Sequence, residues 1–511
     1  MFLQLRRRLA AGLPRNTGRD LRFWTRAIYI TLPLLLVFNY LIIFHWSYFD
    51  SFYHRVFPDH TFHPAPVPPL AHTHESHDAP ELDYWTWNTT TRFESPRLNL
   101  TSANTPCAVF PRYLLKKIQV VLKVGAADHW SRTDAQLSSV IKCISNVLVA
   151  SDRLHTYGPK LEAHDVLAPL PPESYMHEDD YAVYASQKNA SVKDLRQGHE
   201  GWKIDKYKFL PQVEQAVQAN ADAEWFVFLE SDTYIFWDNV FRLLENYDHT
   251  HPYYFGSPSP GRVYPDTDGQ KNWFAYGGAG FVLSNAAAHR LVDRKRNSLG
   301  LKGPRVTDEY REDVLHDCCG DSVLGYALHD KAGVDISGLW PMFNPHPLAG
   351  VPFGKWYWCE PVISLHKTAP EDFLKLWQWE NKRDRRTGPL LYRDLATYHH
   401  LDTFTQRQNW DAADFDGFTE PDNSPAHTSL AACSAACTAN AACFQYTWHG
   451  QHCYMARSMR LGHSKAPDGV HDEVDRAYVS GWDVVKIERW RREHMCAEGP
   501  HWVKPSVKRI F

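Results

Sequence analysis

The most informative stretch of the chain is residues 225–237, WFVFLESDTYIFW. Five apolar residues run directly into Glu230-Ser231-Asp232, after which apolar residues resume. This pattern predicts a buried strand that delivers oxygen ligands at its carboxyl end, where open α/β sheets bind their ligands. Carboxylate oxygens suit a hard divalent cation that keeps coordination positions free for a substrate. A strand ending in a solvated acidic turn fits the same three residues, so the triplet alone leaves both interpretations open.

Strands and helices alternate on both sides of this stretch. Residues 118–125, IQVVLKVG, predict a buried strand, and apolar spacing over 134–150 predicts a helix. A second helix is expected over 206–219, and Asp238 is expected to cap a third. Strands that alternate with helices predict an α/β fold with a largely parallel sheet.

Composition limits the possible classes of protein. The chain has 511 residues, of which 44% are hydrophobic, so it can bury one large core and a smaller second one. This composition excludes a disordered protein. The formal net charge is −4, and no basic patch is interleaved with aromatic residues. Nucleic acid is therefore not an expected partner.

The N-terminal residues have the pattern of a membrane anchor. Residues 27–49 contain no charged residue and are long enough to span a bilayer. Seven arginines and one acid precede them, so the positive-inside rule places residues 1–26 in the cytosol. No small-residue cleavage site follows the apolar segment. The sequence predicts an uncleaved, single-pass type II membrane protein with a lumenal remainder.

Two further features fit a lumenal location. Glycosylation sequons occur at Asn88, Asn99 and Asn189, and all ten cysteines follow residue 100, as disulfides in an oxidising compartment would. Residues 50–105 are rich in proline, histidine and threonine and lack apolar periodicity, which predicts an extended stem. The stem histidines are irregularly spaced, so we favour a solvated tether over a metal site there.

A second informative stretch is residues 274–284, FAYGGAGFVLS. Its glycines, Gly277 and Gly278 among them, let the backbone approach a ligand closely, and Ser284 is expected to cap a following helix. Structural tight turns use the same residues. The spacing matches neither a P-loop nor a dinucleotide-binding fingerprint.

These stretches occur in a fixed order with three others: WKIDKYK at 202–208, GDSVLG at 320–325, and Trp358-Cys359 followed by Ser364-Leu365-His366. In this order, behind an N-terminal anchor, they resemble the fringe-like and core 1 β1,3-galactosyltransferase-like enzymes, grouped as glycosyltransferase family 31. The resemblance covers about residues 110–380. It implies a GT-A fold within residues 106–385, a nucleotide-sugar donor such as a UDP-sugar, and a manganese ion.

The resemblance also implies roles for individual residues. Asp232 corresponds to the last acid of the family's Asp-x-Asp-type motif and His366 to its downstream histidine, so both are expected to bind the metal. Ser231, Gly277 and Gly278 are expected to contribute to the nucleotide-sugar site. Glu230 stands where the family usually has aspartate, so its contact with ribose or with a metal-bound water is open. Viewed alone, His366 would be an ordinary packed histidine.

Asp321 matches the acid that acts as the base in fringe-like enzymes, where another acid usually precedes it; here Gly320 takes that place. One carboxylate near the acceptor hydroxyl is needed to take its proton as the oxygen attacks the anomeric carbon. A single displacement of this kind inverts the configuration. Asp321 as a helix cap remains an alternative. So do other nearby acids as the base, namely Asp308, Glu309, Glu312, Asp313 and Asp317.

The C-terminal part contains a second group of cysteines. Residues 386–425 are polar and predict a linker, after which four cysteines fall within residues 433–453. Residues 426–511 resemble the disulfide-rich α+β PAN/apple-type modules. That resemblance implies pairing of Cys433 with Cys453 and of Cys437 with Cys443, although four cysteines allow three pairings. A carbohydrate- or protein-binding module and a purely structural cap are both open.

Adjacent cysteines rarely bond to each other, because their geometry is poor. Cys318 and Cys319 are therefore expected to find partners among Cys359, Cys107 and Cys143. Zinc is disfavoured at the cysteines because no paired Cys-x-x-Cys units occur.

The sequence thus predicts a metal-dependent, inverting glycosyltransferase of the Golgi membrane. It would move a hexose from a UDP-sugar to a hydroxyl of a glycan or glycoprotein, in a β1,3 linkage by the family resemblance. Two rivals remain. One is a non-catalytic lumenal carbohydrate-binding protein, which the variant Glu-Ser-Asp triplet would suit. The other is a glycoside hydrolase, which also uses two carboxylates but does not need Asp232 and His366 to share a metal.

Overall fold

The computed structural model describes residues 84–85, 87, 107, 110–157, 161–190, 195, 200–264, 269–355, 358–471 and 475–510. The expected cytosolic tail and anchor lie outside these residues, as does the expected stem apart from Tyr84, Trp85 and Trp87. In the part of the chain that is described, no helix is both long and apolar enough to cross a bilayer. The chain divides into two compact units, and the described residues all belong to the second, Leu82–Phe511.

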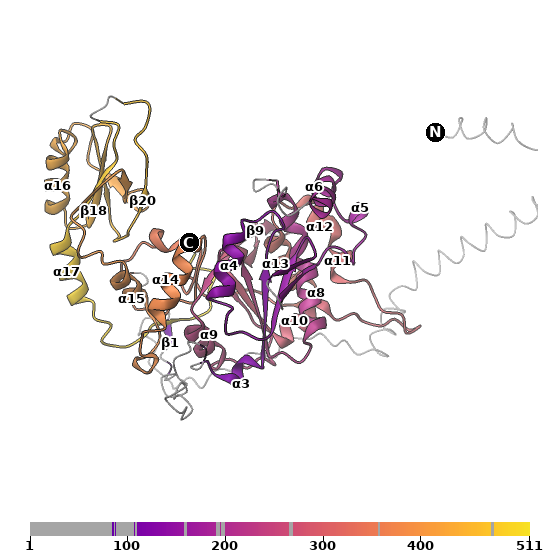
Figure 1. Ribbon diagram of the computed structural model, residues 1–511. Coiled ribbons are helices and arrows are strands. Elements are labelled where there is room, and N and C mark those ends of the chain that lie inside the picture. The colour runs from indigo at the N-terminus through magenta and orange to yellow at the C-terminus, as the bar shows by residue number, and fades with distance from the viewer. Residues whose placement is uncertain are drawn as a thin grey trace, which may run out of the picture. The chain divides into compact units, whose positions relative to one another are not determined.

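The centre of this unit is an eight-stranded mixed sheet between layers of helices (Figure 1). In spatial order its strands are β12 (Ser337–Gly338), β8 (Tyr254–Gly256), β11 (Phe281–Ser284), β6 (Trp225–Glu230), β2 (Ile118–Lys123), β3 (Val147–Ser151), β5 (Leu161–Asp165) and β4 (His155–Tyr157). Strands β6, β2, β3 and β5 are parallel, as predicted. Strands β11 and β4 run antiparallel to their neighbours. The β4–β5 connection, residues 158–160, is too short for a parallel crossover.

Alternation along β2 explains why helices cover both faces of the sheet. Val120 and Leu122 belong to one hydrophobic core and Val121 to the other, because successive strand side chains point to opposite faces. Helices that contribute to the first core are α3 (Arg112–Leu115), α4 (Trp130–Ser138), α9 (Trp237–Leu244), α14 (Pro370–Glu380), α15 (Tyr392–Tyr398) and α17 (Val484–Glu493). Helices that contribute to the second are α5 (Pro172–Tyr175), α6 (Glu178–Asn189), α7 (Trp202–Asp205), α8 (Phe209–Ala219), α10 (Asn285–Val292), α11 (Val306–Glu309), α12 (Arg311–His316) and α13 (Gly320–Ala332).

The helix predicted over 134–150 is wrong beyond Ser138. Helix α4 ends at Ser138, and Val147–Ser151 form strand β3 beside β2. The β-branched residues of Val147–Ser151 favour a strand, and pairing with β2 buries them. The helical spacing of apolar residues that continues from α4 into Val147–Ser151 is coincidental.

Two predicted helix caps have different outcomes. Ser284 caps α10 as predicted, since its hydroxyl accepts a hydrogen bond from the Ala287 N–H at 3.2 Å. Asp238 does not cap α9, because Phe236 occupies the N-cap position. Asp238 lies in the first turn instead, and its Oδ2 accepts a hydrogen bond from Arg242 Nε at 3.2 Å. An acid in the first turn is also favoured by the helix dipole.

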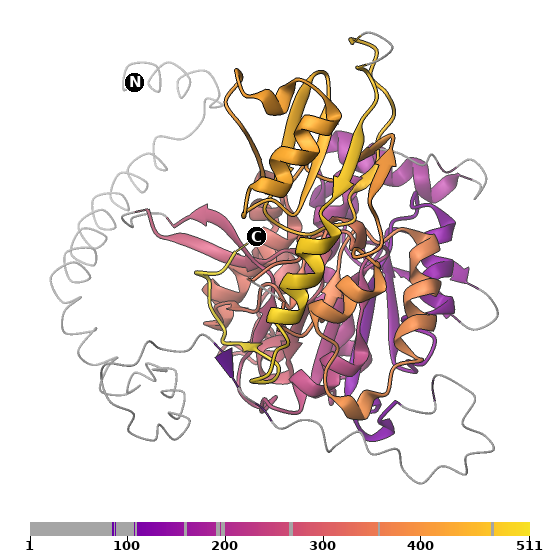
Figure 2. The same cartoon turned by 90° about the vertical axis from the view of Figure 1, so that its left-hand side faces the viewer.

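The C-terminal residues form a five-stranded antiparallel sheet with α16 (Leu430–Ala439) packed against it (Figure 2). Its strands in order are β15 (Gln406–Gln408), β21 (Val479–Trp482), β18 (Gln445–His449), β19 (His452–Ala456) and β17 (Gly417–Thr419). Residues 386–425, expected to be a linker, supply β15, β17 and α15, whose Tyr392 and Leu395 are buried in the first core. Helix α17 (Val484–Glu493) follows β21.

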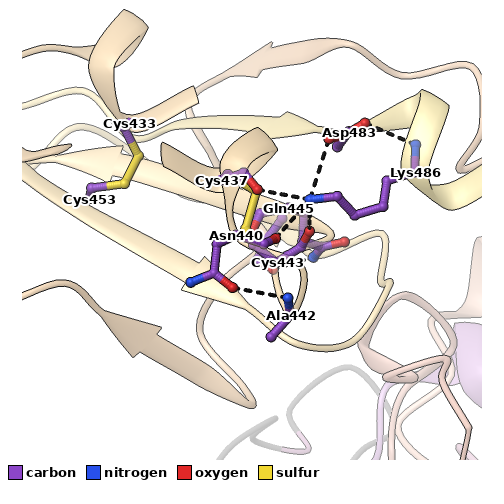
Figure 3. The surroundings of a disulfide bond; sticks show 10 residues. Cys433, Cys437, Asn440, Ala442, Cys443, Gln445, Cys453, Asp483 and Lys486 are labelled. Carbon is purple, nitrogen blue, oxygen red and sulfur yellow. Dashed lines mark hydrogen bonds and ion pairs between the residues drawn. A yellow bond between two sulfur atoms is a disulfide. The ribbon is translucent and has the colours of Figure 1, made fainter. Parts of the chain in front are cut away.

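The disulfides of this region have the expected pairing, Cys433 with Cys453 and Cys437 with Cys443. Lys486, in the first turn of α17, lies beside the second of them (Figure 3). Its ammonium group donates hydrogen bonds of 2.8 to 2.9 Å to the carbonyl oxygens of Cys437, Asn440 and Cys443. One lysine thus ties the start of α17 to the end of α16 and to the turn that follows it.

The expectation for Cys318 and Cys319 is wrong, because these adjacent cysteines form a disulfide with each other. Their expected partners are engaged elsewhere: Cys107 pairs with Cys143, and Cys359 with Cys496. Sequence spacing carries no information on which sulfurs the tertiary fold brings together. The Cys359–Cys496 bond and the pairing of β1 (Tyr84–Trp85) with β22 (Trp502–Val503) tie distant segments of the chain together.

Candidate active site

The turn after β6 is held in place by side chains from other elements. Gln136 Nε2, on α4, donates hydrogen bonds to the carbonyl oxygens of Glu230 (3.1 Å) and Thr233 (2.8 Å). The Thr233 hydroxyl donates to the Gly278 carbonyl at 2.7 Å and accepts from the Glu230 N–H at 3.1 Å. These contacts join the acidic turn to the glycine-rich turn that was singled out in the sequence. Each turn therefore fixes the backbone of the other.

Asp232 and His366 lie together at the carboxyl end of β6. Asp232 Oδ1 is 3.4 Å from His366 Nε2, and its Oδ2 is 3.6 Å from Arg132 Nη1. Burial acts to raise the pKa of Asp232, but His366 and Arg132 outweigh it and hold the pKa below its ordinary value. Donor atoms of Glu230, Asp232 and His366 all lie within 4.8 Å of one another. The structure thus brings the two expected metal ligands together and adds Glu230.

Strand pairing explains how His366 reaches Asp232 across more than a hundred residues. Strand β14 (Ser364–Leu365) pairs with β7 (Tyr234–Ile235), which follows the acidic turn directly, so His366 continues β14 beside Asp232. The Thr368 N–H also donates a hydrogen bond to the Asp232 carbonyl at 3.0 Å.

This donor set fits a divalent cation. Two carboxylates and an imidazole suit manganese and related metals. His366 is 6% exposed, and its Nδ1 is buried with no hydrogen-bond partner among the described residues. Burying an imidazole is costly unless its nitrogens have partners, and a cation beside Asp232 would supply one for Nε2. The unpaired Nδ1 lacks the outer partner that usually supports a metal-bound histidine.

Gly278 makes room for the His366 ring. A Cβ on Gly278 would lie 2.3 Å from His366 Cε1 and 2.4 Å from its Nε2. At the other glycine of the pair, Gly277, a Cβ would lie 2.9 Å from the Phe209 ring and 3.2 Å from Glu230 Oε1. Close approach of side chains to the backbone therefore accounts for both glycines.

We expect Gly278→Ala to lower metal-dependent activity by about 10–100-fold, the usual effect of disturbing the support of a metal ligand. The added methyl group must turn the His366 imidazole away from Asp232. Gly354→Ala is the matched control, because a Cβ there meets no atom within 4 Å. Turnover and thermal denaturation of both variants check this. Full activity in Gly278→Ala would show that the His366 position is not needed.

Asp321 lies in the first turn of α13, and its carboxylate is held by backbone N–H groups. Its Oδ2 accepts a hydrogen bond from Gly277 at 2.8 Å, and its Oδ1 accepts from Ser322 at 2.9 Å. Asp321 is not the N-cap of the helix, since Cys319 occupies that position. Burial raises the pKa of Asp321 to about 6, although the Gly277 N–H opposes this. A carboxyl with that pKa is ionised near neutral pH and is basic enough to accept a proton.

The structure explains why glycine stands at 320 in place of an acid. A Cβ at Gly320 would lie 2.3 Å from the Lys206 carbonyl oxygen and 2.5 Å from Phe209 Cδ2. No side chain fits between α13 and the residues before α8. The departure from the family pattern is therefore linked to close packing in this chain.

A buried charge network beside the site was not foreseen in the sequence analysis. Lys123, the last residue of β2, is 5% exposed, forms an ion pair with Asp205 and lies 2.9 Å from Glu230 Oε1. Lys208 Nζ lies 3.1 Å from Asp205 Oδ1. Burial acts to lower the pKa of Lys123, but Asp205 and Glu230 outweigh it and raise the pKa. The available signal was a lysine at the end of a strand, IQVVLK, whose only other polar residue is Gln119.

These residues line one cleft with a volume of about 850 Å³. Lys123, Glu230, Asp232, His366 and Asp321 all contribute to its wall. Further lining residues are Asp128, Arg132, Trp202, Asp205, Lys206, Lys208, Ser231, Tyr276, Gly278, Cys318 and Cys319. Ser231 is buried in this wall, and its hydroxyl donates a hydrogen bond to Asp128 Oδ2 at 2.9 Å. The volume is within the range of small-molecule and cofactor sites.

Residues 178–338 match the Fringe-like family model. The chain contains a Fringe-like domain. The matched residues include Glu230, Asp232, Gly278 and Asp321, whereas His366 lies beyond them. The ligand cluster therefore combines residues of the matched Fringe-like segment with a histidine that the later strand β14 positions.

Curated relatives of the Fringe-like domain are named as glycosyltransferases. A glycoprotein-N-acetylgalactosamine 3-beta-galactosyltransferase 1 of Xenopus laevis is 27% identical over 173 residues, which cover 30% of this chain and 44% of the relative. The β-1,3-N-acetylglucosaminyltransferase lunatic fringe of Xenopus laevis is 34% identical over 124 residues, or 23% of this chain and 31% of the relative. Lunatic fringe of Danio rerio is 30% identical over 131 residues, covering 24% and 32%. The chain thus spans less than half the length of these relatives.

Proposed function

We propose that the protein is a metal-dependent, inverting glycosyltransferase that moves a hexose from a UDP-sugar to a hydroxyl of a glycan or glycoprotein. The observation that carries this proposal is the meeting, in one cleft, of the Glu230, Asp232 and His366 donor atoms with the carboxylate of Asp321. The names of the relatives support transfer in a β1,3 linkage. The charged wall of the cleft, with its group of possible metal ligands, favours sugar transfer over a non-catalytic carbohydrate-binding protein or a glycoside hydrolase.

Asp232 and His366 would hold the cation, with Glu230 beside them. A divalent cation, for which we propose manganese, supplies positive charge that stabilises the departing diphosphate. Arg132 lies 3.6 Å from Asp232, and its side chain is 43% exposed, so its guanidinium is available to a phosphate oxygen at the same place. Arginine matches phosphate oxygens in pairs, which would fix the orientation of the donor.

Asp321 would take the proton of the acceptor hydroxyl. Its Oδ2 already receives the Gly277 N–H, which holds the carboxylate in a single orientation. A positioned carboxylate contributes about 10²–10⁴-fold to such a step. Because the base would act on an incoming hydroxyl rather than form a covalent bond to the sugar, one displacement occurs and the anomeric configuration inverts.

Trp202 is suited to contact the acceptor. It lines the cleft and is 62% exposed, so its ring is accessible to a ligand in the cleft. Sugars present apolar C–H faces that pack on such rings. Trp202 belongs to the 202–208 stretch that carried part of the family resemblance.

A screen of UDP-sugars with manganese tests the proposal. UDP release is measured with and without candidate glycan acceptors, and we expect one donor to show release that rises with acceptor and disappears with a chelator. Release that depends on acceptor but not on a metal would contradict the assigned role of Asp232 and His366. Release of free sugar from a glycan without any donor would favour a glycoside hydrolase instead.

The location and the C-terminal region are part of the same proposal. The charge-free residues 27–49 would anchor the protein in the Golgi membrane as a type II protein, with the cleft on the lumenal side. Five disulfides among the described residues suit an oxidising lumen. The sheet and helix with Cys433–Cys453 and Cys437–Cys443 would form a PAN/apple-like module that binds carbohydrate or protein or caps the fold.

A further inference from the structure

A second group of potential metal ligands lies in the C-terminal sheet region, outside the residues that line the cleft. His449, Asp468 and His471 each offer a donor atom, and the three atoms lie within 4.8 Å of one another. His449 is the last residue of β18, whereas Asp468 and His471 lie in the segment that follows β20 (His463–Ser464). Nothing in the proposed transferase reaction uses these residues.

The Asp468 carboxylate is held so that one of its oxygens faces both imidazoles. Its Oδ1 accepts hydrogen bonds from the N–H groups of Val470 and His471, both at 3.1 Å. Its Oδ2 lies 2.8 Å from His449 Nε2 and 2.7 Å from His471 Nδ1. The backbone bonds therefore fix the carboxylate from behind and leave Oδ2 for the two ring nitrogens.

The His449 ring is also fixed by packing, whereas the His471 side chain is 41% exposed and contacts the His449 ring. The His449 ring, 8% exposed, stacks on Tyr478 with centroids 3.6 Å apart and planes at 12°. The His471 ring meets the His449 ring edge-on at 5.0 Å. Gly450 has a φ of +56°, and a Cβ there would lie 2.6 Å from His471 Nε2, so glycine is needed both for the turn and for the ring.

We propose that His449, Asp468 and His471 form a binding site for a divalent transition-metal cation, with Zn²⁺ as the best match. Two imidazoles and one carboxylate are a common ligand set for zinc, which takes a water or another ligand in its fourth position. Ligand atoms about 2.0–2.1 Å from a tetrahedral zinc stand roughly 3.3 Å apart. Admitting the ion therefore requires the Asp468 oxygen to withdraw by about 0.5 Å from each ring nitrogen.

The ion would cross-link the β18–β19 hairpin to the segment that contains residues 465–471. A metal that binds only the folded arrangement stabilises it by mass action. The affinity is expected to be moderate, because His449 Nδ1 is buried without a hydrogen-bond partner in the described part of the chain. Lack of such an outer partner typically costs about 10–100-fold in metal affinity.

Zinc content of the full-length chain tests this site. The experiment uses Asp232→Ala as the background, which removes a ligand of the cleft site, and compares His471→Gln and Asp468→Asn with the control His463→Gln. His463 is an exposed histidine of β20 outside the cluster. Zinc per chain is measured after gel filtration, and Co²⁺ is added as a spectroscopic probe. Histidines elsewhere in the chain contribute equally to all variants.

We expect His471→Gln and Asp468→Asn each to lose one zinc equivalent and the tetrahedral Co²⁺ absorption, and His463→Gln to lose neither. Asp468→Asn is the safer variant for folding, since its amide oxygen still accepts the Val470 and His471 N–H groups. Melting temperatures without metal identify a variant that has failed to fold. If Asp468→Asn folds and keeps its zinc content and Co²⁺ spectrum, the three residues are a hydrogen-bonded group and the proposed site is wrong.

Discussion

Replacing Asp321 by asparagine is expected to lower kcat by about 10²–10⁴-fold, the usual contribution of a positioned general base. Asparagine has nearly the same shape, and its amide oxygen can still accept the Gly277 N–H that Asp321 Oδ2 accepts at 2.8 Å. Donor binding should therefore change little, whereas thermal stability should fall modestly, because the Ser322 N–H that Asp321 Oδ1 accepts at 2.9 Å would face the amide NH2 of asparagine. Turnover at saturating UDP-sugar and acceptor, measured as UDP release, checks the expectation.

Glu312→Gln is the matched control for this substitution. Glu312 was one of the alternative acids in the sequence, and it lies on α12 with its carboxylate exposed and paired with Arg311. Its loss should leave turnover unchanged. If Asp321→Asn kept full turnover, the base would lie elsewhere, and the inverting mechanism would need another carboxylate at the cleft.

The activity of the unmodified protein should also depend on the ionisation of Asp321. Burial raises the pKa of this carboxyl to about 6, so the protonated, inactive form accumulates as the pH falls through that value. We expect kcat to fall on the acidic side with a midpoint at or somewhat below pH 6, since a bound cation adds positive charge nearby. A pH profile with no acidic limb above pH 4.5 would contradict this assignment.

Replacing Asp232 by alanine is expected to abolish manganese-dependent binding of UDP. The substitution removes the carboxylate that lies 3.4 Å from His366 Nε2 and 3.6 Å from Arg132, so two basic side chains lose their shared anion. Loss of a direct ligand should cost more than the about 10–100-fold that loss of an outer partner costs. The measurement is the thermal shift caused by UDP with manganese, which we expect to be lost.

Asp222→Ala provides the control, because Asp222 is an exposed acid a few residues before β6. It should retain the full thermal shift. An unchanged shift in Asp232→Ala would mean that UDP binds without the proposed ligand. The remaining candidate would then be a carbohydrate-binding protein whose cleft does not need the metal.

Much of the central fold followed from local patterns. The mostly apolar runs at 118–122 and 225–229 form adjacent parallel strands, because such runs are stable only when both faces of the sheet are covered. The acid-hydroxyl-acid triplet, the glycine-rich turn and Asp321 were each visible as short motifs whose chemistry differs from that of their surroundings. The sequence pattern gave a wrong prediction over residues 134–150. Apolar residues keep a helical spacing there by chance, whereas Val147–Ser151 form a strand that pairing with β2 stabilises.

The sequence alone determined which groups are available for chemistry. These are Asp232, His366 and Asp321, together with the glycines Gly277 and Gly278. Only tertiary structure decided that β14 sets His366 against Asp232, that Lys123 is buried between Asp205 and Glu230, and that Cys318 bonds to Cys319. The physical reason is that strand pairing, burial and disulfide geometry depend on distances in space. Residues far apart in the sequence do not encode those distances in any short motif.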